Sequence, residues 1–580
     1  MNEMNTATLE FEKKISAKAA KISGSEALLL CLIAEGVDTI FGYPGGAIMP
    51  IYDALYKYKD RLTHILTRHE QGAVHAAQGM ARVTGKVGVC FATSGPGATN
   101  LITGIADAQI DSTPLVCITG QVPSHLLGTD AFQETDVMGI SMPITKWNYQ
   151  VTKAEEIPFA LARAFYIAST GRPGPVLIDI TKDAQFAEFD FEYQKCERIR
   201  SYHPYPELSL DKLKEAAQII NDAKKPFILV GQGVQLSGAE QELIQFAEKT
   251  GIPMASTLLG LSAVPTNHPL YVGYLGMHGN YGPNIKTNEC DVLIAIGMRF
   301  DDRVTGDLKL YARQAKVIHI EIDPSEIDKN VKATVAINTD AKAALKGLIS
   351  MVDQGNHAAW IAEFHACDVI ENDKVIQAET FPDSGEIKMA EVIRRISELT
   401  SGEAILVTDV GQHQMVANRY YKFQKTLSCI TSGGLGTMGF ALPAAMGAKT
   451  GRPDRTVIAV IGDGGFQMTI QELGTIRQSN IGVKILILNN NFLGMVRQWQ
   501  QLFFEKRYSF TELDNPDFQL ITQGYRISTQ KVSNREYLDK ALEDWLSTDG
   551  PALLEVVVEQ EENVFPMVPS GASVSDIRLE

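Results

Sequence analysis

Two oxygen-bearing side chains, Asp463 and Asn490, each follow a short apolar run in the C-terminal third of the sequence. Asp463 lies in Gly-Asp-Gly-Gly after 456–461, and Asn490 lies among three asparagines after 484–488. Runs of Val, Ile and Leu that end in small or polar residues are typical of buried parallel strands, whose carboxyl ends bind ligands at one edge of a sheet. Such oxygens suit Mg²⁺, which usually keeps water and phosphate oxygens among its ligands. The flanking glycines would let the backbone approach a diphosphate, whereas Gly-Asp-Gly alone would indicate only a turn.

This arrangement resembles the signature of thiamine diphosphate enzymes, in which Gly-Asp-Gly is followed at a similar interval by Asn-Asn. The resemblance implies that Asp463, Asn490 and the backbone carbonyl of Phe492 bind Mg²⁺. It also implies that thiamine diphosphate contacts a set of small or apolar residues: Gly436, Met438, Gly462, Gly464 and Gly465. Met438 would be the apolar wedge that holds the cofactor bent. The alternative is a core methionine in a Gly-rich loop.

The cofactor must lose a proton from its thiazolium carbon, which requires a carboxylic acid beside its pyrimidine ring. Burial in an apolar site would raise the pKa of that acid. The segment Arg68-His-Glu70-Gln-Gly72 resembles the family segment that contains it, and small apolar residues follow it, as on a packed helix. The resemblance therefore implies that Glu70 activates the cofactor. Considered alone, Glu70 would more readily be a solvated or salt-bridged surface residue.

Within these enzymes, the resemblance is closest to the acetohydroxyacid (acetolactate) synthase family and extends from about Ser23 to about Ser570. Matching segments are 41–47, 93–100, 131–134, 171–175 and 494–500. The Gln-Trp-Gln in the last of these is specific, because other thiamine diphosphate lyases generally lack it.

This closer resemblance implies roles for five further residues. Gln133 would lie near the active centre and Lys182 at the substrate entrance, while Met495 and Trp499 would shape the pocket for the second substrate. Such a pocket can distinguish one methylene by only ~1–3 kcal/mol. Arg303 would hold a substrate carboxylate through a charge-assisted hydrogen bond. A structural ion pair with the neighbouring Asp301 or Asp302 is the alternative for Arg303.

Biosynthetic members of the family bind FAD without using it for redox chemistry, whereas catabolic acetolactate synthases lack it. The family's FAD-associated stretch is present as Arg299-Phe-Asp-Asp-Arg303. The resemblance implies flavin contacts from Arg172, Gly231, Gly233, Thr257, Leu258, Met277, His278, Gly297, Arg299, Asp301, Arg303, Glu321, Ile322, Asp323, Asp340, Ala341, Gln414 and Met415. Gln232 and Thr339 replace glycines that are usual in the family, and either change could loosen flavin binding.

The elements that must position these residues alternate between short β-branched runs and longer helical stretches. The clearest strand candidates are 87–92, 115–119, 176–180, 227–230, 292–296, 317–320, 405–407, 456–461, 484–488 and 552–558. The pattern predicts an α/β protein with three doubly wound domains and mostly parallel sheets. Polar stretches at 184–209 and 353–386 are interpreted as connections, which gives domains 22–190, 205–350 and 385–580. By resemblance these are a pyrimidine-binding domain, a Rossmann-like FAD-binding domain and a diphosphate- and Mg²⁺-binding domain.

Composition excludes several classes of protein. A chain of 580 residues is too long for one core, and 45% hydrophobic with 21% charged residues is typical of a globular protein. The net charge of −16 argues against nucleic-acid binding. Residues 1–21 lack the apolar core of a signal peptide, and no early apolar run approaches the ~20 residues that span a bilayer. The seven cysteines are scattered without a CxxC pair, which favours reduced thiols in a cytoplasmic protein.

The resemblance implies an acetolactate synthase activity that decarboxylates pyruvate and transfers the two-carbon unit to a second pyruvate or to 2-oxobutanoate, in branched-chain amino acid biosynthesis. It further implies a homodimer or tetramer and a small regulatory subunit. The main alternative is a flavin-dependent pyruvate oxidase, which shares the domains and cofactors. The Gln-Trp-Gln and Arg-Phe-Asp-Asp-Arg segments favour the synthase. A catalytically silent paralogue is disfavoured because Glu70, Asp463 and Asn490 are all present.

Overall fold

The computed structural model of the chain describes residues 21–580, which form two compact units. Unit 1 contains the described residues up to His203, and unit 2 contains Pro204–Glu580. The segment for which no signal peptide is expected lies outside the described residues, except for Lys21. Three six-stranded sheets dominate the fold, and every pair of neighbouring strands within them is parallel. The predicted α/β class with parallel sheets is therefore confirmed.

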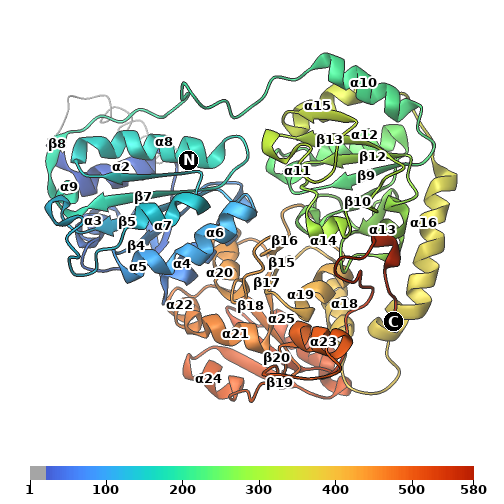
Figure 1. Cartoon of the computed structure of the whole chain (residues 1–580). Coiled ribbons are helices and arrows are strands. Elements are labelled where there is room, and N and C mark those ends of the chain that lie inside the picture. Colours follow the sequence, from blue (N-terminus) through green and yellow to red (C-terminus); the bar gives the residue numbers. More distant parts are fainter. Residues whose placement is uncertain (1–20) are drawn as a thin grey trace, which may run out of the picture. The chain divides into compact units, whose positions relative to one another are not determined.

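Unit 1 contains one of these sheets, with strand order β3-β2-β4-β5-β7-β6 and helices on both faces (Figure 1). The central strands are buried along their whole length, as near-continuous apolar runs predict. Its strands are β2 (Thr39–Gly42), β3 (Thr63–Leu66), β4 (Gly88–Ala92), β5 (Leu115–Gln121), β6 (Trp147–Val151) and β7 (Pro175–Thr181). Its helices are α2 (Gly24–Ala34), α3 (Met49–Leu55), α4 (Glu70–Thr84), α5 (Pro96–Asn100), α6 (Ile102–Ile110), α7 (Val137–Ser141), α8 (Ile157–Ser169) and α9 (Lys182–Phe186). A short antiparallel pair, β1 (Lys21–Ser23) with β8 (Glu188–Asp190), joins the two ends of the unit.

The first sheet of unit 2 has strand order β11-β10-β9-β12-β13-β14. Its strands are β9 (Pro226–Val230), β10 (Met254–Ser256), β11 (Tyr271–Tyr274), β12 (Val292–Ile296), β13 (Lys316–Glu321) and β14 (Val335–Asn338). The accompanying helices are α10 (Leu210–Asn221), α11 (Gly233–Leu236), α12 (Glu240–Thr250), α13 (Tyr281–Thr287), α14 (Asp302–Thr305) and α15 (Ala341–Ile349). One apolar cluster fills each face of this sheet.

The second sheet of unit 2 has strand order β16-β15-β17-β18-β20-β19. Its strands are β15 (Ile405–Thr408), β16 (Cys429–Thr431), β17 (Val457–Gly462), β18 (Lys484–Asn489), β19 (Ser528–Val532) and β20 (Ala552–Val557). Its helices are α18 (Met389–Leu399), α19 (Gln412–Tyr420), α20 (Ala441–Gly451), α21 (Asp463–Thr469), α22 (Leu473–Gln478), α23 (Gly494–Phe503), α24 (Phe518–Gly524) and α25 (Leu538–Ser547). The ends of β17 and β18 carry the residues predicted to bind metal.

The charged stretch 353–386, interpreted from sequence as a plain connection, is mostly helical. It contains α16 (Ala358–Glu371), a π-helical turn at Asn372–Ile376 and α17 (Gln377–Thr380). Glu371 at the end of α16 forms a fully buried ion pair with Arg419 of α19 and also accepts hydrogen bonds from Asn280 Nδ2 and the backbone N–H of Tyr281. The segment therefore fastens the two sheets of unit 2 together. The exact domain boundaries remain a prediction.

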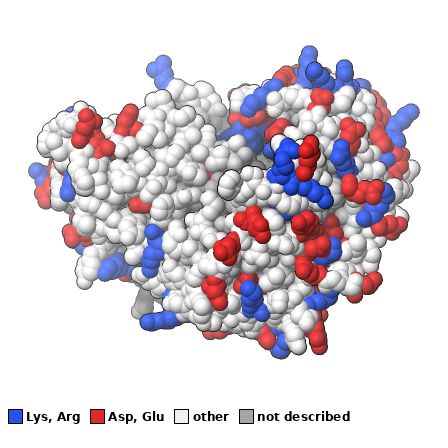
Figure 2. All heavy atoms as spheres, turned by 60° about the horizontal axis from the view of Figure 1, so that its bottom comes forward, with Lys and Arg blue, Asp and Glu red and all other residues white. Residues whose placement is uncertain are grey.

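The charge pattern of one face and the character of the helices can be described directly. On the face shown in Figure 2, Lys and Arg side chains are interspersed with Asp and Glu, without a continuous basic patch of the kind that nucleic acids require. Within residues 21–580, no helix has the length and apolar character needed to cross a bilayer. All seven cysteines are free thiols.

Candidate active site

The predicted metal ligands lie at the carboxyl edge of the second sheet of unit 2. Strands β17 and β18 pair with Gly462 opposite Leu488, so Asp463 and Asn490 follow neighbouring strand ends. The side chain of Asn515 donates hydrogen bonds to Asp463 Oδ2 (2.7 Å) and to Asn491 Oδ1 (2.9 Å). One amide thus ties the two strand ends together.

Asp463 suits a cation. Its side chain is buried, and burial raises its pKa to about 6. Among the described residues it forms no ion pair, and a buried carboxylate without a cation partner is costly. The same part of the chain contains no group of three His, Cys, Asp or Glu side chains that could hold a metal. A site made of one carboxylate, one amide and one backbone carbonyl is compatible with Mg²⁺, which completes its shell with water and phosphate oxygens.

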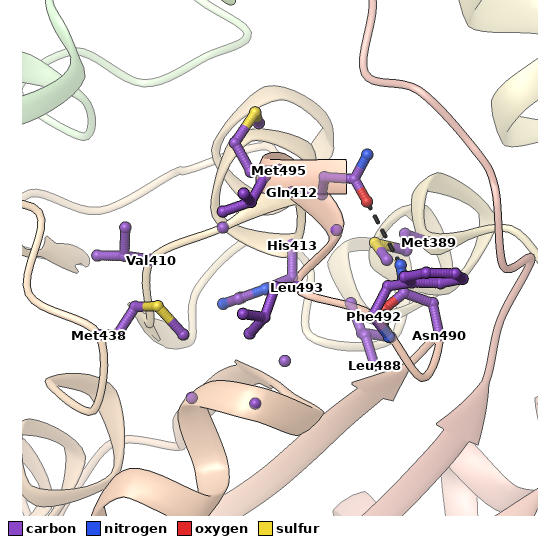
Figure 3. A pocket seen from close by; sticks show the side chains of 16 residues that line it. Met389, Val410, Gln412, His413, Met438, Leu488, Asn490, Phe492, Leu493 and Met495 are labelled. Carbon is purple, nitrogen blue, oxygen red and sulfur yellow. Dashed lines mark hydrogen bonds between the residues drawn. The ribbon is translucent and has the colours of Figure 1, made fainter. Parts of the chain in front are cut away.

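A pocket opens beside these strand ends (Figure 3). Seven of the residues predicted from sequence line it: Met438, Gly462, Gly464, Gly465, Asn490, Phe492 and Met495. The remaining lining residues are Met389, Val410, Gly411, Gln412, His413, Leu488, Leu493, Gly494 and Val496. Most of the wall is apolar, and its polar side chains are Gln412, His413 and Asn490. Such a pocket fits a flat ring at its apolar wall and a charged group at its polar end.

Sequence reasoning missed His413, which enters the pocket from the first turn of α19. Its Nε2 is buried without a hydrogen-bond partner among the described residues, and burial lowers its pKa to about 3. The imidazole is therefore neutral and can donate or accept one hydrogen bond. A Cβ at Gly462 would lie 2.8 Å from His413 Nδ1, so the glycine makes room for the ring. The position of Gly-Gln-His shortly after the apolar run 405–407 was the available signal.

Asp409, also missed, positions the loop that carries Met438. Its carboxylate accepts hydrogen bonds from the backbone N–H groups of Gly439 (3.0 Å to each oxygen), Ala441 (3.0 Å) and Val410 (2.8 Å). Burial raises its pKa to about 6, although these hydrogen bonds oppose the shift. The resemblance-based role of Met438 as a wedge is thus supported by an anchored loop, while the role itself remains a prediction.

Helix α23 carries the two residues predicted to shape the second-substrate pocket. Met495 lines the pocket, whereas Trp499 lies one turn further along and packs on Phe503, with ring centroids 5.1 Å apart. Between them, Arg497 and Gln498 are fully buried.

In unit 1, Glu70 is the first residue of α4 and is 8% exposed. Its Oε2 accepts a hydrogen bond from Asn100 Nδ2 (2.9 Å), and it forms no ion pair with any described residue. A Cβ at Gly97 would lie 3.1 Å from Glu70 Oε1. Glu70 is therefore not the solvated or salt-bridged surface residue of the alternative interpretation.

Gln133 lies against the same glycine-rich segment, because a Cβ at Gly95 would be 2.8 Å from its carbonyl oxygen. Lys182 follows β7 at the carboxyl edge of the unit 1 sheet. Arg172 lies at the opposite edge, where its guanidinium donates to Ser112 Oγ (2.9 Å) before β5 begins. Arg172 is thus separated from Glu70 within unit 1.

The residues predicted to contact flavin in unit 2 gather at the carboxyl edge of its first sheet. Predicted contacts follow these strand ends: β9 is followed by Gly231 and Gly233, β10 by Thr257 and Leu258, and β12 by Gly297 and Arg299. Strand β13 ends at Glu321 and is followed by Ile322 and Asp323, and β14 is followed by Asp340 and Ala341. Gly233 packs directly on Gly297, and a Cβ on Gly231 would lie 2.1 Å from the Gly297 oxygen. From the second sheet, Gln414 donates to Thr431 Oγ1 (2.7 Å) and Met415 packs on the core. Gly436 has a φ of +70°, which favours glycine.

Arg303 is mostly exposed, and its ion pair with Asp302 (3.7 Å) is exposed as well, so that pair stabilises little. Asp301 instead caps α14 and pairs with Arg299 (3.8 Å). His278 is buried with Nδ1 unpartnered among the described residues, and burial lowers its pKa to about 4. Met277 accepts a hydrogen bond from Arg303 on its sulfur (3.4 Å).

The two departures from the family pattern have different surroundings. Thr339 is buried and donates a hydrogen bond to the carbonyl of Pro206 (3.1 Å). Gln232 is partly exposed at the start of α11. Thr339 therefore secures the chain where it enters unit 2.

Comparison with known proteins identifies the class to which the chain belongs. Family models match three parts of the chain: the N-terminal thiamine pyrophosphate-binding domain at residues 22–140, the central domain at 213–348 and the C-terminal thiamine pyrophosphate-binding domain at 409–556. These matches define the class, a thiamine pyrophosphate enzyme with all three parts.

Similar curated proteins narrow the class. The chain is 46% identical to the acetolactate synthase isozyme 2 large subunit of Escherichia coli K12, over 96% of this chain and 99% of that protein. It is 45% identical to the acetolactate synthase large subunit of Corynebacterium glutamicum (97% and 91%) and to acetolactate synthase 2, chloroplastic, of Nicotiana tabacum (96% and 85%). The chain belongs to the acetolactate synthase large-subunit family.

Proposed function

We propose that the chain catalyses acetolactate synthesis. It would take a two-carbon unit from pyruvate, with loss of carbon dioxide, and join it to a second pyruvate or to 2-oxobutanoate, in branched-chain amino acid biosynthesis. The observation that carries the proposal is the pocket of unit 2, whose wall is largely apolar and which lies beside two neighbouring strand ends that are followed by Asp463 and Asn490. The relatives are named acetolactate synthases, and nothing found favours the flavin-dependent pyruvate oxidase.

The residues of the pocket fit thiamine pyrophosphate and Mg²⁺. Asp463, Asn490 and the Phe492 carbonyl would hold the metal, while Gly462, Gly464, Gly465 and His413 would lie beside the diphosphate. Bound there, the cofactor supplies the electron sink for decarboxylation. Met438 and Leu493 would exclude water from the apolar wall, because both line it.

Glu70 would hold the proton that activates the cofactor. Its buried carboxyl group has no cation partner among the described residues, and Asn100 fixes one of its oxygens. Gln133 and Lys182 would act on the substrate, as would Arg303. Within residues 21–580, the Arg303 side chain has an exposed ion pair with Asp302 and a hydrogen bond to the Met277 sulfur.

FAD is the proposed third cofactor. The dinucleotide would lie at the carboxyl edge of the first sheet of unit 2, in agreement with the rule for open parallel sheets. Nδ1 of the buried His278 has no hydrogen-bond partner in the described part of the chain, and such a ligand could supply one. Neither Gln232 nor Thr339 removes a charged contact from the proposed set.

The proposed assembly is a homodimer or tetramer that works with a small regulatory subunit. The relatives are named large subunits, which implies a smaller partner for those proteins. The cytoplasm is the proposed compartment, on the pattern of free cysteines.

The test is acetolactate formation from pyruvate by the purified, flavin-stripped chain with thiamine pyrophosphate and Mg²⁺, with and without added FAD. Acetolactate that requires FAD, with no electron acceptor reduced, is the expected result. Acetolactate without FAD would identify the catabolic branch instead. Acetate with reduction of an acceptor would refute the proposal in favour of the oxidase.

A further inference from the structure

A chain of buried side-chain amides runs from the proposed metal ligand to the backbone of the C-terminal segment. Asn490 Nδ2 donates to Gln412 Oε1 (3.4 Å; Figure 3), and Gln412 Nε2 donates to Gln498 Oε1 (2.9 Å). Gln498 Nε2 donates to the carbonyl of Val564 (3.2 Å). All three amides are at most 4% exposed.

The backbone of Val564 fixes the direction of this chain. The oxygen and nitrogen of an amide have nearly the same size, so only hydrogen bonds determine which end points where. The N–H of Val564 donates to Gln498 Oε1 (2.9 Å), and a backbone N–H cannot act as an acceptor. Gln498 must therefore present its oxygen both to Val564 and to Gln412.

The orientation of the Gln498 amide in turn determines the orientation of the Gln412 and Asn490 amides. Gln412 must direct its nitrogen toward Gln498, and this nitrogen also donates to the carbonyl of Glu562 (2.7 Å). Its oxygen is left to face Asn490, which must then offer its nitrogen. Asn490 Oδ1 consequently points away from Gln412, where it accepts from the N–H of Phe492 (3.2 Å).

We propose that Gln412 and Gln498 are positioning residues that set the polarity of the Asn490 amide, so that it presents oxygen and not nitrogen to the metal. An amide coordinates a hard cation through oxygen only. Neither glutamine touches the metal in this role. The inference deepens the proposed function, because it rests on Asn490 being a metal ligand.

The close packing at Gly494 supports a tightly defined arrangement. A Cβ at this position would lie 2.1 Å from Gln412 Oε1 and 2.9 Å from Asn490 Nδ2. The two amides therefore meet in a space that admits only glycine. Arg497 holds the Glu562 carbonyl that accepts from Gln412, because Arg497 Nη2 donates to the same oxygen (2.7 Å).

The test measures Mn²⁺ binding by electron paramagnetic resonance, with the full chain saturated with thiamine pyrophosphate. Gln412→Met removes the amide that connects Asn490 to Gln498 and nearly conserves the side-chain volume. We expect Mn²⁺ affinity to fall about two- to tenfold, the range that corresponds to one hydrogen bond. Gln314→Met is the matched control, because Gln314 Nε2 donates to two backbone carbonyls of the first sheet's domain, those of Thr287 and Cys290. The control should leave the Mn²⁺ affinity unchanged.

A second background separates positioning from a purely structural role. Asn490→Asp presents oxygen in either orientation and places a carboxylate oxygen against Gln412 Oε1, so Gln412→Met should not lower Mn²⁺ affinity in that background. Gln498→Met, one rung further from the metal, should behave in the same way and replaces Gln412→Met if that variant does not fold. An equal loss of affinity in the wild-type and Asn490→Asp backgrounds, or no loss in the wild-type background, would overturn the proposal.

Two further measurements distinguish failure of this inference from failure of the proposed function. If Asp463→Ala retains Mn²⁺ affinity, the metal site is wrong and the inference falls with it. If the metal binds and the cycle behaves as expected while no acetolactate forms, the positioning role stands and the proposed reaction is refuted.

Discussion

Asp463→Asn should make the metal-free protein more stable while abolishing metal binding. The carboxyl group of Asp463 is 1% exposed, and burial raises its pKa to about 6. Its one side-chain partner, Asn515, donates a hydrogen bond that an asparagine oxygen at position 463 can also accept. The substitution therefore removes a buried charge without removing that hydrogen bond.

The magnitude follows from proton linkage. A carboxyl group whose pKa is higher in the folded than in the unfolded chain contributes stability at low pH, and this contribution is lost as pH rises from its ordinary pKa to the raised one. A rise of about two pKa units corresponds to about 3 kcal/mol lost by pH 7. The Asp463→Asn variant has no carboxyl group there to ionise and would not lose this stability. At pH 7 without metal, the variant should therefore unfold at a higher urea concentration than the wild type, and the difference should shrink toward pH 4.

The assay is urea unfolding of the full chain in EDTA at pH 4, 5.5 and 7, monitored by circular dichroism. It is repeated with Mg²⁺ and thiamine pyrophosphate. The ligands should stabilise the wild type at pH 7 but not the variant. Asp409→Asn is the matched control, because Asp409 has the same raised pKa but accepts hydrogen bonds from several backbone N–H groups. It should be destabilised at pH 7. An Asp463→Asn protein that is less stable than the wild type at pH 7 without metal would refute the reasoning.

Three further predictions concern other buried groups. Glu70→Gln should abolish most acetolactate formation. The thermal midpoint should change little, because the amide oxygen can still accept the hydrogen bond from Asn100. Turnover at the wild-type rate would contradict the role of Glu70. Arg419→Met should lower the thermal midpoint strongly, because it leaves the buried Glu371 carboxylate unpaired at a cost of about 3–5 kcal/mol. A variant of unchanged stability would exclude a structural role for this ion pair. Burial raises the pKa of Glu379 to about 8, so the stability that this group contributes is lost as pH rises from about 4.5 to 8. Glu379→Gln should therefore raise the thermal midpoint at pH 8.5 but not at pH 4.5. Thermal midpoints of the variant and the wild type that change in parallel with pH would contradict this prediction.

The amino-acid sequence by itself determined the class of fold and the central strands. Every predicted strand coincides with an observed one to within two residues, for example 292–296 with β12. Strands buried on both faces are near-continuous apolar runs, so they can be predicted without knowledge of the tertiary structure. The strand β19 at one sheet edge (Ser528–Val532) was missed, because most of its side chains are exposed and polar.

The helix α16 was missed for a related reason. It lies in the stretch 353–386, which was interpreted as a connection because of its charged residues. Only a narrow face of the helix is buried, formed by Trp360, Phe364, Cys367 and Glu371. Burial of Glu371 depends on Arg419, which lies far away in the sequence. A contact of this kind has no local signature.

The candidate site divides in the same way. Asp463 and Asn490 could be found from sequence because they follow strands whose ends must meet at one sheet edge. The neutral state of His413 and the orientation of the Asn490 amide could not, since both depend on burial and on partners such as Gln412 and Gln498 that only the folded chain brings together. Sequence determined which groups the site contains, and the tertiary structure decided their protonation and direction, because both are set by desolvation and by hydrogen bonds between distant segments.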